Sequence, residues 1–235
     1  VRTFYCLRHP RRIQWRALGN AIEFCGYRAL PIIGILSFLV GVVLAYQMGI
    51  QLRNYGANIF AVNFIGLSLL REFSPLMTAI IIAGRSGAAF TARLGTMTVN
   101  KEIDALRTMG IAPVERLVLQ KFFGLMIALP LLTVWSDITG VIGGMIMANN
   151  MLGIGYDEFL TRFQQVIPLK TYIIGIAKSP LFAIIIASIG CFQGFQVEGS
   201  AESVGQETTK SVVRAIFLII CADALFSVLL SWNNL

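Results

Sequence analysis

Residues 29–52 read ALPIIGILSFLVGVVLAYQMGIQL, an uncharged apolar run with the length of one membrane-spanning helix. Four more predominantly apolar segments follow, at about residues 60–83, 122–148, 171–195 and 213–232. Of the 235 residues, 56% are hydrophobic and only 13% are charged, about half the charged share of a soluble domain. The sequence therefore predicts an all-α integral membrane protein with five transmembrane helices, and it excludes a soluble globular domain.

The segment before the first span, residues 1–28, has the composition of a basic amphipathic helix. It carries six arginines against one acid, Glu23, with Ile13, Trp15, Leu18, Ile22 and Phe24 interleaved at roughly helical spacing. Such a helix lies in the plane of the membrane interface. It has no long apolar core or small-residue cleavage site, so we expect an interfacial helix rather than a signal peptide or a solvated tail. A five-span domain then occupies residues 29–235.

The basic residues set the orientation of the five spans. The N-terminal segment and the polar stretch 84–121, which has six Lys and Arg side chains, fall on the same side of the membrane. The opposite loops offer Arg53, Arg162 and Lys170. By the positive-inside rule, the N-terminus is predicted to be cytoplasmic and the C-terminus to lie outside. We attribute the net charge of +7 to these loops beside an anionic leaflet, not to nucleic-acid binding.

Motifs for catalysis are missing from the sequence. His9 is the single histidine, which excludes histidine triads and multi-histidine metal sites, and there is no Gly-x-Ser-x-Gly or HExxH pattern. Residues 205–211 end in Lys-Ser but lack the glycine before the lysine, so they are not an ATP-binding Walker A loop. Asp157 and Glu158 are expected to be solvated in a polar loop. Four cysteines are isolated, which predicts neither a disulfide framework nor a metal site: Cys6, Cys25, Cys191 and Cys221.

Charged residues inside the apolar segments are the informative exceptions, because each is costly in a bilayer unless it is paired or hydrated. They are Arg71, Glu72, Asp137, Lys178 and Asp223. One interpretation is an internal ion-pair network that holds the helices together. The other, which we favour, is a set of residues that line a polar substrate or gating region. A proline follows closely after two of these sites, and Pro75 is expected to kink the second span.

The stretch 100–113, NKEIDALRTMGIAP, has the pattern of a short helix between two spans. Ile103, Leu106 and Met109 recur at helical spacing, and Gly110 is placed to end the helix in the left-handed conformation, with Pro113 beyond it. A charged helix held between two spans suits a docking element for a soluble partner, although a lone interfacial helix has the same pattern. Small residues at close-packing spacing, Gly140 with Gly144 and Gly190 with Gly194, indicate tight helix contacts and support a dimer.

These residues together resemble the MlaE family, the permease subunits of MCE-associated ABC lipid transporters. The resemblance is carried by Ser68-Leu69-Leu70-Arg71-Glu72, Pro75, Ala83-Gly84-Arg85-Ser86-Gly87 and the stretch from Glu102 to Pro113. It extends over nearly the whole chain, from the interfacial helix through five spans with a cytoplasmic coupling helix between the second and third. Asp137 departs from the pattern, since an apolar residue is expected there.

The resemblance implies a homodimeric permease in a bacterial inner membrane, with a dimer of cytoplasmic ABC ATPases and a periplasmic MCE-domain ring, and often a STAS-domain protein. The ATPase, not this chain, would bind ATP and Mg²⁺, and this chain would hold no cofactor and no metal. Its implied substrate is phospholipid, moved between inner and outer membranes in support of outer-membrane lipid asymmetry. The alternative is a non-transporting scaffold that anchors a periplasmic complex.

The resemblance also assigns roles to individual residues. Lipid-binding positions are expected at Leu44, Met48, Gln51 and Tyr55, along a cavity between the two protomers. A buried polar network is expected from Arg71, Glu72, Lys178 and Asp223. Coupling to the ATPase is expected from Glu102, Ile103, Asp104, Leu106, Arg107, Met109 and Gly110, within a cytoplasmic region of about residues 84–121.

Overall fold

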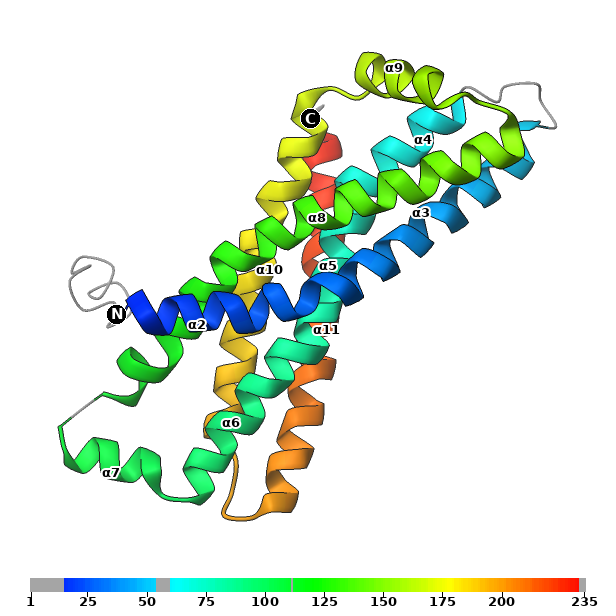
Figure 1. Cartoon of the computed structure of the whole chain (residues 1–235). Helices are drawn as coiled ribbons and strands as arrows, with labels where there is room; N and C mark the ends of the chain where they lie inside the picture. Colours follow the sequence, from blue (N-terminus) through cyan, green and yellow to red (C-terminus); the bar gives the residue numbers. More distant parts are fainter. Residues whose placement is uncertain (1–14, 54–59, 111, 233–235) are drawn as a thin grey trace. The chain divides into compact units, whose positions relative to one another are not determined.

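A computed structural model describes residues 15–53, 60–110 and 112–232, and every regular element in these ranges is helical (Figure 1). Tyr55 and residues 1–14 of the expected interfacial helix lie outside the described residues. Five helical stretches are long and apolar enough to cross a membrane: Gly19–Arg53, Phe60–Val99, Leu119–Leu152, Leu169–Phe195 and Ala201–Leu230. The five predicted spans are therefore confirmed as helices.

The elements follow one another along the chain in the order shown in Figure 1. They are α2 (Trp15–Cys25), the 3₁₀ turn η2 (Tyr27–Ala29), α3 (Leu30–Arg53), α4 (Phe60–Ser68), the π-helical turn η3 (Leu69–Phe73), α5 (Ser74–Ile82), the π-helical turn η4 (Ala83–Gly87), α6 (Ala88–Val99), α7 (Glu102–Thr108), the π-helical turn η5 (Val114–Val118), α8 (Leu119–Leu152), α9 (Tyr156–Val166), α10 (Leu169–Phe195) and α11 (Ala201–Trp232).

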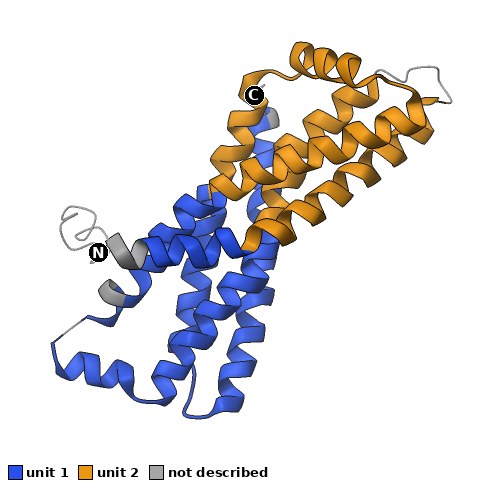
Figure 2. Cartoon of the chain, in the orientation of Figure 1, with its two compact units in different colours: residues 1–28, 79–129, 180–235 blue, residues 29–78, 130–179 orange. Residues whose placement is uncertain are grey.

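Two compact units divide the chain, and each draws on separate parts of the sequence (Figure 2). Unit 1 comprises residues 1–28, 79–129 and 180–235, and unit 2 comprises residues 29–78 and 130–179. The expected division into an interfacial helix, residues 1–28, and a five-span domain, residues 29–235, follows the order of the chain and is a different division from these two units.

In unit 1, α11 packs along α6 and the turn η4. A Cβ on Gly190 would lie 3.1 Å from the Gly87 carbonyl oxygen, so α10 and η4 meet through their backbones. Thr91 Oγ1, fully buried, lies 2.9 Å from both the Gly190 carbonyl oxygen and Ser211 Oγ, which ties α6 to α10 and α11.

In unit 2, α3 packs against α8 through glycines. A Cβ on Gly41 would overlap the carbonyl oxygen of Gly140, and one on Gly143 would overlap the carbonyl oxygen of Phe38. Ser37 and Ser136, on the same two helices, share a buried hydrogen bond of 2.6 Å. Small side chains therefore let these two helices approach to backbone contact.

These contacts correct one inference from the small residues. Gly140 and Gly144 pack against Leu69 and Ile65, while Gly190 and Gly194 pack against Gly87 and Leu94, all within the chain. Close helix packing at these glycines is confirmed. Their contribution to a dimer is not supported, because neighbouring helices of the same protomer already occupy them.

Three segments expected to be polar connections are helical instead. The second span continues as helix through η4 and α6 to Val99, because Phe90 and Leu94 give its last turns a buried apolar face. The fifth long helix begins at Ala201 rather than near residue 213, since Ser200 Oγ accepts a hydrogen bond from the Ser203 N–H and caps it. In the connection after α8, Phe159 is buried and anchors α9.

Candidate functional site

The expected polar site begins at η3, the π-helical turn that carries Arg71 and Glu72. Pro75 has no N–H to donate, and just before it the Ser74 N–H bonds to the Leu69 carbonyl, one residue further back than in an α-helix. The expected kink at Pro75 is thus preceded by a local change of helix type. π-helical turns frequently mark functional positions inside long helices.

The Glu72 carboxylate forms ion pairs with two cationic side chains of unit 2. Lys178 Nζ on α10 lies 2.6 Å from Glu72 Oε2, and Arg71 Nε lies 3.5 Å from Glu72 Oε1. The Lys178 side chain is 2% exposed, whereas those of Glu72 and Arg71 are 28% and 24% exposed. The ammonium group of Lys178 is therefore the deeply buried member, and Glu72 is its carboxylate partner.

Hydroxyl groups flank this ion pair on α8 and α10. Ser179 Oγ, next to Lys178, shares a buried hydrogen bond of 2.8 Å with Thr133 Oγ1. Asp223, also assigned to the network, is largely buried but lies on α11 in unit 1. Within unit 2 the structure brings together Arg71, Glu72 and Lys178.

Asp137 is a buried carboxyl group in unit 2, at a position where the family resemblance led us to expect an apolar residue. It is 2% exposed, and neither of its oxygens has a hydrogen-bond partner among the described residues. The Ser74 hydroxyl lies near it but outside hydrogen-bonding geometry.

The expected lipid-binding residues lie on the last turns of α3. Leu44 and Met48 are half-buried, and Gln51 is exposed. Their spacing of four and then three residues places them on one helical face, while Gly41, Ala45 and Gly49 form the buried face beside them. Leu44, Met48 and Gln51 thus form a partly exposed face on the last turns of α3, available to a lipid or to another protein chain.

The short helix α7 confirms the predicted element between the second and third spans. Lys101 begins it with a left-handed backbone, φ 60°, and Gly110 follows it with φ 74°, as predicted for a left-handed cap. The Gly110 N–H donates to the Arg107 carbonyl at 3.0 Å. A residue with a left-handed backbone conformation therefore flanks α7 on each side and limits its length.

One coupling residue was misassigned as a partner contact. Ile103 is 3% exposed, so it packs α7 onto its own chain. Leu106 is half-buried, Met109 is 63% exposed, and Glu102, Asp104 and Arg107 are exposed, with Arg107 Nη1 3.3 Å from Asp104 Oδ1. The surface left for a partner is apolar at Leu106 and Met109 and charged around them.

The amphipathic helix α9 was not predicted, although its signal is present in the sequence. Phe159 and Phe163 are four residues apart, and their rings stack with centroids 6.1 Å apart. Phe159 joins Val62 and Ala148 in a buried cluster, and the Arg162 guanidinium lies 5.8 Å from the Phe60 ring. The acidic pair Asp157 and Glu158 is exposed in the first turn, where carboxylates favour a helix.

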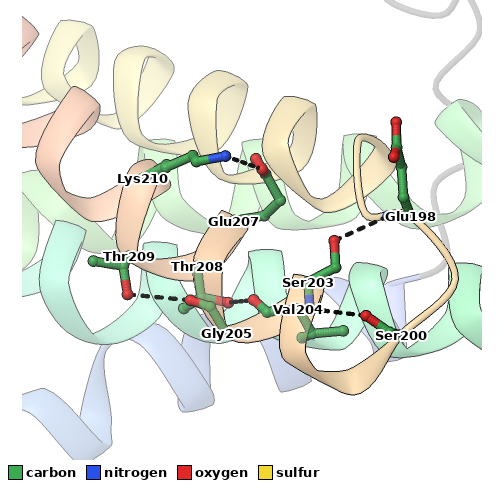
Figure 3. Close-up of polar contacts among 9 residues, drawn as sticks. All are labelled: Glu198, Ser200, Ser203, Val204, Gly205, Glu207, Thr208, Thr209 and Lys210. Atoms are coloured by element: carbon green, nitrogen blue, oxygen red, sulfur yellow. Dashed lines mark hydrogen bonds and ion pairs between the residues drawn. The ribbon is translucent and has the colours of Figure 1, made fainter.

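Residues 205–211, whose Lys-Ser ending suggested a phosphate loop, lie inside α11 (Figure 3). Thr208 and Thr209 donate to the carbonyl groups of Val204 and Gly205, and Lys210 Nζ lies 2.7 Å from Glu207 Oε1. These side chains bond to other groups of α11, and residues 205–211 form helix rather than a glycine-rich phosphate loop.

Comparisons with known proteins bear on this arrangement. Residues 18–229 match the family described as Permease MlaE. A probable ABC transporter permease protein of Rickettsia typhi is 33% identical over 207 residues, 88% of this chain and 80% of that protein. The chloroplastic protein TRIGALACTOSYLDIACYLGLYCEROL 1 of Arabidopsis thaliana is 30% identical over 92% of this chain and 62% of its own length. The intermembrane phospholipid transport system permease protein MlaE of Haemophilus influenzae is 28% identical over 91% of this chain and 82% of its own.

Proposed function

This chain belongs to the MlaE permease family, and we propose that it forms the path by which an ATP-driven transporter moves phospholipid between the inner and outer membranes. It is the permease subunit of an ABC transporter and not the ATPase. The Haemophilus relative is named for intermembrane phospholipid transport, which supports phospholipid as the substrate class. Such transport would contribute to outer-membrane lipid asymmetry.

The observation that carries this proposal is the exposed surface of α7. Leu106 and Met109 offer a small apolar anchor, and Glu102, Asp104 and Arg107 surround it with charge. An apolar centre supplies affinity while the surrounding charges set orientation. We propose that α7 docks on the cytoplasmic ATPase, which binds ATP and Mg²⁺ and transmits its closure through this helix.

The remaining parts of the assembly follow from the same proposal. Two copies of the chain would enclose a lipid cavity, with Leu44, Met48, Gln51 and Tyr55 along its wall. With a cytoplasmic N-terminus, α7 faces the ATPase, and α9, one span later, faces the opposite compartment, where a periplasmic MCE-domain ring would dock. We propose a STAS-domain protein as a further partner on the ATPase side.

The ion pair of Glu72 and Lys178 would give the cavity a polar floor. The Lys178 ammonium group is buried beside a partly exposed carboxylate, so a second anion such as a lipid phosphate would find a cation below the surface at this point. We propose that Arg71, Glu72 and Lys178 border the path of the headgroup rather than only stapling helices.

A pair of matched variants tests the coupling role. Leu106→Asp places a charge in the apolar anchor of α7, and Leu160→Asp places the same charge on an exposed leucine of α9. We expect Leu106→Asp to lose ATPase co-purification and lipid-dependent ATP hydrolysis, and Leu160→Asp to keep both. Retention of both by Leu106→Asp would place the docking surface elsewhere. If the intact complex hydrolyses ATP at a rate independent of lipid, the chain is a scaffold.

A further inference from the structure

A cluster of positive charge in unit 1 stands outside the proposed transport path. The cluster, here called the Phe24 cluster, consists of Arg28, Arg85 and Lys121 with the rings of Phe24 and Phe90. The Cζ atoms of Arg28 and Arg85 each lie 5.8 Å from the centre of the Phe24 ring. Lys121 Nζ lies 5.1 Å from the centre of the Phe90 ring. The buried Cys25 side chain is within electrostatic range of both Arg85 and Lys121.

Among the residues that the structure describes, the cations of the Phe24 cluster have no carboxylate partner. No ion pair joins Arg28, Arg85 or Lys121 to an acid among the described residues, and Glu23 on the same helix as Phe24 pairs with none of them. A guanidinium has five N–H donors. Arg85 uses one of them, from Nη1, for the Phe24 carbonyl oxygen at 3.4 Å. The face of an aromatic ring compensates a cation only in part, because it carries no net charge.

The position of these residues along the spans places them at the level of lipid headgroups. Arg28 directly precedes α3, and Lys121 lies in the first turn of α8. Arg85 directly follows the second predominantly apolar segment, residues 60–83. Tyr27, beside Arg28, is 72% exposed, which is typical of aromatic residues at a membrane interface.

The surface beside Arg85 is open. Gly84 is exposed, and a Cβ added there would meet no atom within 4 Å. Arg85 itself is only partly buried, so a ligand can reach donors of its guanidinium group that Phe24 does not use.

We infer that the Phe24 cluster binds the phosphate of an anionic phospholipid of the surrounding membrane, with the guanidinium groups of Arg28 and Arg85 as its main ligands. Guanidinium groups bind phosphate oxygens in bidentate geometry, and anionic lipids are the nearest source of negative charge at this depth. This site requires only a membrane-embedded chain, so it stands or falls separately from the transport proposal.

The test is lipid binding by the full-length purified chain in detergent, measured by native mass spectrometry with phosphatidylglycerol and with zwitterionic phosphatidylcholine. We expect tighter binding of phosphatidylglycerol, weakened about fivefold by Arg85→Gln and about 25-fold by Arg28→Gln with Arg85→Gln, since each guanidinium group that contacts the bound phosphate contributes about this factor. Arg85→Lys should keep part of the affinity. Arg53→Gln, at the exposed end of α3, is the control and should bind as the unaltered chain does.

Two results would overturn the inference. One is equal affinity of the unaltered chain for the two lipids, and the other is unchanged phosphatidylglycerol affinity in the double variant. Arg28 is exposed, so Arg28→Gln alone should fold normally and show the fivefold loss even if a change at Arg85 impairs folding.

Discussion

Lys178 shows how a buried charge can depend on a residue far away in the sequence. Its ammonium group is almost fully buried and lies 2.6 Å from Glu72, which is 106 residues away. Removal of the carboxylate takes away part of the charge that stabilises this ammonium group in a medium of low dielectric constant, and breaking a buried ion pair can cost about 3–5 kcal/mol.

Glu72→Gln is therefore expected to lower the free energy of unfolding of the purified permease by about 3 kcal/mol, near the lower end of that range because Glu72 is partly exposed. The matched control is Glu207→Gln, which removes the carboxylate from Lys210 in a pair of nearly equal length whose lysine is 52% exposed. That change should cost less than about 1 kcal/mol. Thermal unfolding in one detergent compares the two, and similar losses would show that Lys178 does not rely on Glu72.

The lipid-binding assignment makes a prediction for two neighbouring residues of α3. A photocrosslinker at the half-buried Leu44 should capture more phospholipid during turnover than one at the exposed Val43, which faces outward from this helix. The captured lipid is measured by mass spectrometry. Equal capture at both positions would mean that Leu44 contacts bulk lipid and not a transport cavity.

At the residue scale, the sequence located the charged residues of the network but did not show how deeply each candidate residue is buried. Arg71, Glu72 and Lys178 were recognisable because charges interrupt apolar segments, and the structure brings them together. The inward position of Ile103 could not be read from helical spacing, because the pattern does not say which side of α7 faces its own chain. The sequence likewise did not predict that the Asp137 carboxyl group would have no hydrogen-bond partner among the described residues.

At the scale of elements, hydropathy located five spans but not their full lengths. The first turns of α11 carry Glu202, Glu207 and Lys210, and α9 opens with two acids, so both resembled polar loops. Their helical signals are local instead: the Ser200 cap of α11, and the Phe159 and Phe163 pair of α9. The π-helical turns had no such signal, because their hydrogen-bond register depends on packing against other helices.

Two glycine substitutions of the same kind should have opposite effects. Gly41→Ala would drive a methyl group into the Gly140 carbonyl oxygen and separate α3 from α8, at a cost of about 1–3 kcal/mol or more. Gly205→Ala, in α11 with no atom within 4 Å of the new Cβ, should stabilise the helix by about 0.5–1 kcal/mol. Thermal unfolding in detergent measures both effects, with a lower melting temperature expected for Gly41→Ala and a higher one for Gly205→Ala. An unaltered stability of Gly41→Ala would contradict the close contact of these helices.

At the scale of the whole molecule, the proposed orientation, with five spans and a cytoplasmic N-terminus, puts α7 and α9 in different compartments. We expect Met109→Cys on α7 to react with a membrane-impermeant thiol reagent only after the membrane is opened, and Thr161→Cys on α9 to react in intact spheroplasts. Both positions are exposed, and the native cysteines are replaced to remove background. Labelling of both positions from the same side would contradict the five-span topology.

The central claim is that ATP hydrolysis by a separate subunit drives phospholipid through this permease by way of α7. The most direct test is ATP-dependent transfer of labelled phospholipid out of proteoliposomes that contain the assembled complex, with the Leu106→Asp permease in parallel. Transfer that requires ATP and falls to the ATP-free background with Leu106→Asp is the predicted result. Transfer at the same rate without ATP, or undiminished by Leu106→Asp, would contradict the account.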